Sequence, residues 1–141
     1  MIITLQIECV SGWYLNDKCM RIVEIDDCAS LYDLHEVIQD AVKFGRDHPF
    51  VFYTANSSSP WAHKNLLAEV DEWGGTFSEL YIKEIYPLGR RKLYYLFDFG
   101  DKWTFEVRKK RGSKAPEAGV TYPRVIGEFG PNPQQYPHYE E

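Results

Sequence analysis

The chain has 141 residues, of which 44% are hydrophobic and 16% aromatic, and its formal net charge is −5. This length suits a single domain with its own core, and the composition excludes an intrinsically disordered chain. Because no run approaches the roughly 18 consecutive apolar residues of a spanning helix, we expect no membrane partner. The sequence predicts one domain over residues 1–133 and an extended tail, rich in Pro and Tyr, over residues 134–141.

The cysteines bear on the cellular compartment. Cys9, Cys19 and Cys28 are an odd number in a chain without a secretory signal, which predicts reduced thiols and a cytoplasmic protein. A bridge between Cys9 and Cys19 across a hairpin is the alternative that their positions leave open. Their spacing fits no zinc motif, so we expect no metal and no cofactor.

Three strands are predicted before residue 60. Residues 2–10 alternate between apolar and polar side chains, which is typical of a half-buried strand. Residues 19–26 form a second strand, which pairs with the first as a hairpin. Residues 49–55 form a third strand, which ends at the turn-forming residues 56–60.

Between the second and third strands, residues 31–44 predict the principal helix. Ser30 can cap it, and Asp33 is placed where a carboxylate reaches back to the free amide of the cap. Gly45 is expected to supply the left-handed residue that ends the helix. Apolar residues recur at spacings of three and four, so one stripe faces a sheet. His35 lies beside this stripe and is interpreted as a buried or boundary residue.

The second half of the chain contains a long central hairpin, residues 91–110. Before it, near-helical spacing of apolar residues predicts a short helix at 64–71 and suggests another at 77–85. Within the hairpin, Gly100 and Asp101 have the signature of a two-residue type II′ turn. In that register Tyr94 opposes Val107. The predicted fold is therefore α+β, a mixed but mostly antiparallel sheet with the principal helix packed on one face.

The hairpin contains the triplet Asp98, Phe99 and Gly100, which matches the metal-binding triplet of protein kinases. The chain lacks the glycine-rich phosphate loop, the strand lysine and the catalytic loop that kinases need. We therefore interpret Asp98 and Asp101 as turn residues whose carboxylates accept backbone amides. A catalytic or metal role for this pair is the alternative.

Four motifs occur in a recognisable order. They are a helix of the form L-x-x-L-H-x-x-I-Q, a His before an aromatic strand, a hairpin of the form Y-x-Y-D-F-G-D-x-W with Phe in its third position, and a Tyr-Pro segment before a Gly- and Pro-rich end. The matching residues are Leu31, Leu34, His35, Ile38, Gln39, His48, Phe52, Tyr95, Phe97, Asp98, Phe99, Gly100, Asp101, Trp103, Tyr122, Pro123 and Gly127. From about residue 20 to residue 133 the chain resembles the family named after the third open reading frame of plasmid pRiA4b.

The resemblance implies a compact α+β domain found in plasmid, transposon and chromosomal genes, and it implies no established catalytic residue. The chain departs from the pattern at two places. Met20 and Arg21 stand where a Trp-Arg pair is usual, and the cysteines and acidic proline-rich box expected after Tyr122 and Pro123 are missing. Any role of that C-terminal box is therefore not carried over to this chain.

Positive charge is concentrated at the open end of the predicted hairpin. Pairing of its strands brings together seven of the 16 basic residues, namely Arg90, Arg91, Lys92, Arg108, Lys109, Lys110 and Arg111. The rest of the chain then carries nine basic residues against 21 acidic ones. Such a cluster is either a solvated hairpin end or a binding site for an anionic partner or a nucleic acid.

Three classes of function follow. The leading one is a non-enzymatic binding or adaptor domain, because no catalytic constellation is present and several aromatic residues lie in polar segments: Trp13, Tyr14, Trp61, Tyr136 and Tyr139. The second is a nucleic-acid-associated accessory protein of mobile elements that uses the basic hairpin end. The third is a metal-dependent enzyme, for which tertiary structure would have to gather the candidate polar residues His35, His48, His63, Asp98, Asp101 and Trp103.

Overall fold

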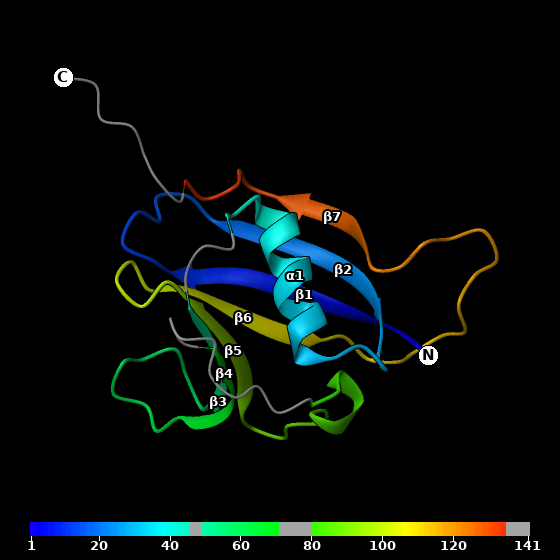
Figure 1. The fold of residues 1–141 in the computed structure, drawn as a ribbon, viewed down its shortest axis with the longest axis horizontal. Coiled ribbons are helices and arrows are strands. Elements are labelled where there is room, and N and C mark those ends of the chain that lie inside the picture. Colours follow the sequence, from blue (N-terminus) through cyan, green and yellow to red (C-terminus); the bar gives the residue numbers. More distant parts are fainter. Residues whose placement is uncertain (46–48, 71–79, 135–141) are drawn as a thin grey trace.

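The computed structural model of the chain describes residues 1–45, 49–70 and 80–134. Its strands are β1 (Ile2–Ser11), β2 (Cys19–Asp26), β3 (Phe50–Ala55), β4 (Asn65–Val70), β5 (Lys92–Phe97), β6 (Trp103–Lys109) and β7 (Arg124–Phe129). They form one sheet in the order β4-β3-β5-β6-β1-β2-β7, and every neighbouring pair is antiparallel. Helix α1 (Leu31–Val42) crosses one face of this sheet (Figure 1). The sheet is therefore entirely antiparallel in the described residues, rather than mixed.

The strands predicted at 2–10, 19–26 and 49–55 are confirmed as β1, β2 and β3. The helix predicted at 64–71 is wrong, because this segment is strand β4. Strand β3 is buried along its whole length, and pairing with β4 satisfies the backbone groups of its outer edge. This tertiary demand outweighs the near-helical spacing of the apolar residues.

Of the helix suggested at 77–85, only the short 3-10 helix η1 (Ile82–Glu84) is present in the described part, which begins again at residue 80. Residues 77–79 lie outside the described residues. The predicted tail also lies outside them beyond Gln134, and so do the two tail tyrosines, Tyr136 and Tyr139. Within the described ranges, no helix is long and apolar enough to cross a membrane.

Helix α1 begins as its sequence predicts. The hydroxyl of Ser30 accepts the amide of Asp33 at 3.1 Å, and the carboxylate of Asp33 accepts the amide of Ser30 at 3.0 Å. The helix ends differently, because Lys43 and not Gly45 adopts the left-handed conformation, with φ of 61°. The buried stripe of α1, which includes Leu34 and Ile38, packs on the main core of the sheet.

The register of the central hairpin is shifted by one residue from the prediction. Leu93 opposes Val107, and Phe97 opposes Trp103. Because side chains alternate between faces, this shift exchanges the faces of one whole strand relative to its partner. As a result Tyr95, and not Tyr94, lies on the face that α1 covers.

The cause of the shift is the connection between β5 and β6, which is the five-residue loop 98–102 and not a two-residue turn. Asp98 and Lys102 are both left-handed, with φ of 61° and 56°, and the amide of Lys102 donates to the carbonyl of Asp98 at 2.6 Å. The carboxylate of Asp98 accepts the amides of Gly100 and Asp101 at 3.1 and 3.3 Å. The assignment of Asp98 to the turn is confirmed, although the turn type is wrong.

The second face of the sheet carries a smaller apolar cluster. Val51, Tyr53 and Ala55 of β3 pack there with Tyr94 of β5, and Ala62 from the loop between β3 and β4 packs against them. The two tyrosine rings stack with their centroids 5.4 Å apart. This loop is therefore fixed to the sheet by apolar contacts.

Candidate anion-binding site

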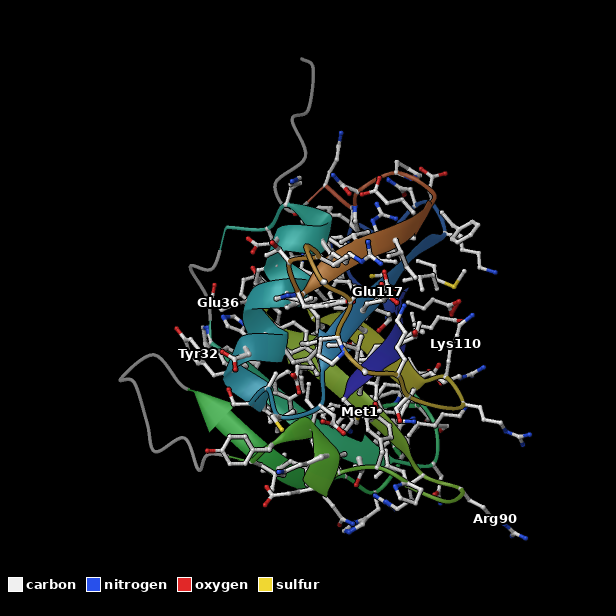
Figure 2. The ribbon with its side chains drawn as sticks, turned by 90° about the vertical axis from the view of Figure 1, so that its right-hand side faces the viewer. Met1, Tyr32, Glu36, Arg90, Lys110 and Glu117 are labelled. Carbon is white, nitrogen blue, oxygen red and sulfur yellow. The ribbon has the colours of Figure 1, made fainter. Side chains whose placement is uncertain are left out.

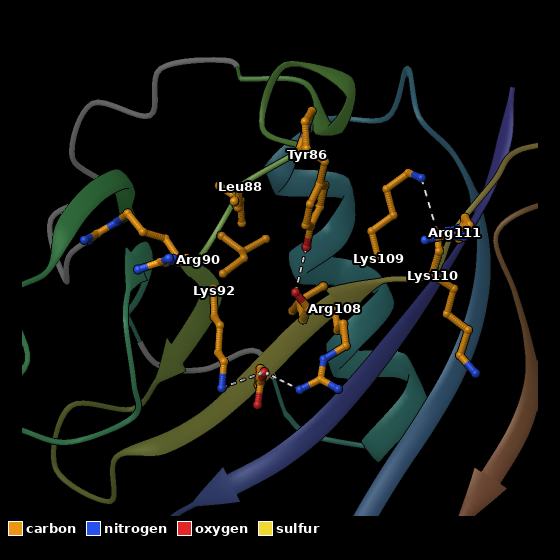
Figure 3. Close-up of a pocket in the computed structure, with 14 residues that line it drawn as sticks. Tyr86, Leu88, Arg90, Lys92, Arg108, Lys109, Lys110 and Arg111 are labelled. Carbon is orange, nitrogen blue, oxygen red and sulfur yellow. Dashed lines mark hydrogen bonds and ion pairs between the residues drawn. The ribbon is translucent and has the colours of Figure 1, made fainter.

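A pocket of about 730 Å³ lies at the open end of the central hairpin, between residues 86–93 and residues 106–111. All seven basic residues that the sequence places at this end line it, together with one carboxylate, that of Glu106. Tyr86 and Leu88 form one wall, and Lys92 and Arg108 reach across the opposite side (Figure 3). The pocket thus joins an apolar wall to a strongly cationic lining.

The segments that form the pocket are held by hydrogen bonds. The hydroxyl of Tyr86 donates to the carbonyl of Val107 at 2.7 Å, which ties the segment before β5 to strand β6. Burial, with a further contribution from the charge of Glu106, raises the pKa of Tyr86, so the phenol stays protonated. Beyond β6, the amide of Lys110 donates to the carbonyl of Thr4 at 2.9 Å. Both walls are therefore anchored to the sheet.

Two of the seven cations are partly neutralised within the pocket. The carboxylate of Glu106 lies 3.8 Å from the ammonium of Lys92 and 3.1 Å from the guanidinium of Arg108. The side chain of Glu106 is only 13% exposed, so its charge acts mainly on these neighbours. Lys92 and Arg108 are available to an external anion only in competition with Glu106.

Arg91 has a structural contact that the sequence does not reveal. Its guanidinium donates to the carbonyl of Thr54 at 2.6 Å and to the hydroxyl of Thr54 at 3.2 Å. It also donates to the carbonyl of His63 at 3.4 Å, so it links β3 to the loop that leads into β4. Lys109 likewise turns back, and its ammonium donates to the carbonyls of Lys110 and Gly112 at 3.2 and 3.3 Å.

The remaining three cations, Arg90, Lys110 and Arg111, are exposed and form no side-chain ion pair or hydrogen bond with any described residue. We call these three residues the free cations. Arg90 and Lys110 project from the same side of the molecule (Figure 2). Unpaired like charges around one hollow produce a local positive potential that attracts anions, even though the chain as a whole is acidic.

The candidate polar site of the sequence does not form one cluster in the described residues. His35 is buried in the core, where its ring stacks on Phe50 with the centroids 3.8 Å apart. The hydroxyl of Tyr95 lies 2.5 Å from Nδ1 of His35 and accepts a hydrogen bond from the amide nitrogen of Gln39 at 2.8 Å. The interpretation of His35 as a buried residue is confirmed.

The other members of that candidate site are dispersed. Asp98 and Asp101 belong to the turn between β5 and β6, and Trp103 is fully buried with its ring against Phe44. His63 lies beside Arg91 at the opposite end of the hairpin, and His48 is outside the described residues. The indole nitrogen of Trp103 has no hydrogen-bond partner in the described part of the chain.

The sequence interpretation missed a different group of metal-ligating atoms. In the described ranges, Asp26, Asp27 and Cys28 place one such atom each within 4.8 Å of the others. Asp26 accepts the amide of Cys28 at 2.9 Å, and Asp27 lies 3.2 Å from the N-terminal amine. The three residues therefore lie together because they form the turn after β2, and this turn holds the N-terminus by its carboxylates.

Arg21, a residue at which the sequence departs from the usual family pair, is buried and bonded on several sides. Its guanidinium donates to the carbonyl of Ala41 at 3.3 Å, to the carbonyl of Phe129 at 3.1 Å and to the side-chain oxygen of Asn132 at 2.6 Å. It therefore connects α1, β7 and the segment after β7. In the alternation of side chains along β2, Arg21 takes a position that faces the core. This position was the feature of the sequence that could have indicated its burial.

These features define a fold that is mostly antiparallel sheet, in which one helix covers one face and a cationic pocket lies at the end of the central hairpin. The fold is shared by a solved structure, that of the protein of unknown function MM3350 from Methanosarcina mazei Go1, with a TM-score of 0.68. The two chains are 19% identical, and the similarity covers 90% of this chain and 68% of that one.

The model of the plasmid pRiA4b ORF-3-like protein family matches residues 5–135. The chain therefore belongs to that family, and the resemblance of its motifs is confirmed. No curated protein matches the chain significantly.

Proposed function

We propose that the chain is a non-enzymatic binding domain whose partner is a phosphate-bearing anion held in the basic pocket. The observation that carries the proposal is the set of free cations, Arg90, Lys110 and Arg111, around a hollow of about 730 Å³. This volume falls within the range of small-molecule and cofactor sites. An anion that enters gains charge-assisted hydrogen bonds without displacing an internal partner of these three side chains.

The chemistry of the lining supports binding in preference to catalysis. Its ionisable groups are seven Lys and Arg side chains, one tyrosine and one carboxylate. The carboxylate of Glu106 faces two cations, and the raised pKa of Tyr86 keeps this residue in the neutral form. General acid–base or nucleophilic catalysis needs a group whose pKa is near the working pH or an activated nucleophile. The lining supplies positive charge and an apolar wall.

The test is a calorimetric titration with inorganic polyphosphate at low salt. We expect binding by the wild type and loss of binding in Arg90→Glu/Lys110→Glu, because two attractive contacts become repulsive. The control is Lys18→Glu/Lys102→Glu, which changes the net charge equally at exposed positions near the other end of the sheet. Equal loss in both variants, or no binding by the wild type, would show that the pocket is not the site.

A cytoplasmic location and an accessory role on mobile elements belong to this proposal. Cys9 and Cys19 lie directly opposite each other in β1 and β2, and both are free thiols, the state that a reducing compartment would maintain. Burial raises the pKa of Cys9 to about 12, and the nearby Cys19 adds to the shift, so the thiol form is favoured.

A further inference from the structure

Trp61 is the most exposed large hydrophobic side chain in the described residues, at 92%. A single exposed apolar residue needs no functional explanation by itself. The position of Trp61, however, distinguishes it from Trp13, which is also exposed, at 78%. Trp61 lies in the loop between β3 and β4, at the same end of the sheet as the basic pocket, because Ala55 at the end of β3 pairs with Lys92 at the start of β5. Trp13 lies in the loop between β1 and β2, near the opposite end of the sheet.

The loop that carries Trp61 is held in place on both sides of the residue. The amide of Trp61 donates to the hydroxyl of Ser59 at 3.2 Å, and the amide of Ala62 donates to the carbonyl of Ser59 at 3.0 Å. Ala62 packs into the apolar cluster on the sheet, and the ammonium of Lys64 lies 5.6 Å from the ring centroid of Tyr53. An aromatic ring on a fixed loop loses little conformational entropy when a ligand covers it.

Arg91 connects this loop to the pocket. It lines the pocket and donates to the carbonyl of His63, only two residues after Trp61. Two residues span at most about 7 Å, so the backbone of Trp61 lies within that distance of a residue that touches the pocket lining. In Figure 1 the loop between β3 and β4 and the segment that enters β5 both lie at the lower side of the sheet.

An exposed indole at the same end of the sheet as a group of unpaired cations fits a particular ligand chemistry. Proteins that bind single strands combine a positively charged groove for the backbone with aromatic side chains on which bases stack. In a duplex the faces of the bases are covered by their neighbours, so a duplex would use the cations without the indole. A free phosphate chain offers no ring for the indole at all.

From this arrangement we propose that the partner is a single-stranded nucleic acid, with phosphates on the free cations and a base stacked on Trp61. This inference rests on the proposed function, because the phosphates occupy the same pocket. It adds an aromatic contact that simple anion binding would not need.

The experiment measures fluorescence anisotropy of a labelled oligothymidylate at low salt, with an oligouridylate in parallel to distinguish DNA from RNA. We expect Trp61→Ala to weaken binding roughly 5- to 140-fold, the range that corresponds to the loss of one stacked base. Trp61→Phe keeps an aromatic face and should retain most of the affinity. Trp13→Ala is the matched control and should bind as the wild type does.

The variants separate failure of this inference from failure of the proposed function. If Trp61→Ala binds both oligonucleotides as the wild type does while Arg90→Glu/Lys110→Glu does not, the stacking inference is wrong and the anion site stands. If the wild type binds a duplex of the same length as tightly as the single strand, the inference is also wrong. If the wild type binds neither polyphosphate nor oligonucleotide, both proposals fail.

Discussion

Salt dependence gives the sharpest test of which cations meet the ligand. For single strands, the slope of log Kobs against log salt concentration is about −0.7 for each phosphate that a cation neutralises. If the three free cations alone bind phosphates, the slope should be about −2, and a fourfold rise in salt should weaken binding roughly 20-fold. If all seven basic residues of the pocket took part, the slope would be about −5. Anisotropy titrations of oligothymidylate at several salt concentrations measure this slope directly.

Two basic residues of the pocket, one free and one engaged, provide the variants for this measurement. Arg111→Gln removes a free cation and should make the slope shallower by about 0.7. Arg91→Gln should leave the slope unchanged, because the guanidinium of Arg91 already donates to Thr54 and His63. A wild-type slope near zero, or a slope that changes equally in the two variants, would refute the distinction between free and engaged cations.

Two predictions concern stability. In Gly12→Ala the new Cβ would lie 2.3 Å from the buried ring of Trp103, so urea unfolding should show a loss of about 1–3 kcal/mol. In Gly100→Ala the nearest contact is 3.4 Å, so this variant should unfold almost as the wild type does, and equal losses would contradict the packing argument. Hydrogen bonds from Lys114 and Arg124 lower the pKa of Glu24, so its stabilising contribution is complete above the ordinary value of about 4.3 and is lost as pH falls through the lower folded-state pKa. Thermal unfolding of Glu24→Gln should therefore show a deficit at neutral pH that shrinks in acid, and a deficit independent of pH would contradict it.

The sequence was sufficient to predict those elements whose structure depends on residues that are neighbours in the chain. Strands β1 and β2 follow from alternation, and α1 follows from the reciprocal hydrogen bonds of Ser30 and Asp33. The register of the central hairpin could not be read in this way. Gly100 suggested a short turn, whereas the left-handed residues of the loop are Asp98 and Lys102. An αL aspartate leaves no distinct signal in a sequence that offers a glycine two positions later.

The candidate site also has one part that the sequence predicts and one part that it does not. The gathering of seven basic residues at one end follows from the pairing of two strands, which tolerates a shift of one residue. The difference between Arg90 and Arg91 does not follow from it, because the contact partner of Arg91 is Thr54, 37 positions away in β3. Sequence patterns show where in the fold basic residues gather. Whether a given basic side chain already has a partner inside the protein depends on the neighbouring strand.

Arg91 therefore has a role that its charge alone would not suggest. It lines the pocket, but its bonds run to β3 and to the carbonyl of His63, within the segment that presents Trp61. If Trp61 stacks on a base, loss of the Arg91 guanidinium should loosen the loop and lower the affinity for a single strand without changing the number of phosphates bound. Affinity that falls at a constant salt slope would distinguish this positioning role from a direct phosphate contact, in which affinity and slope fall together.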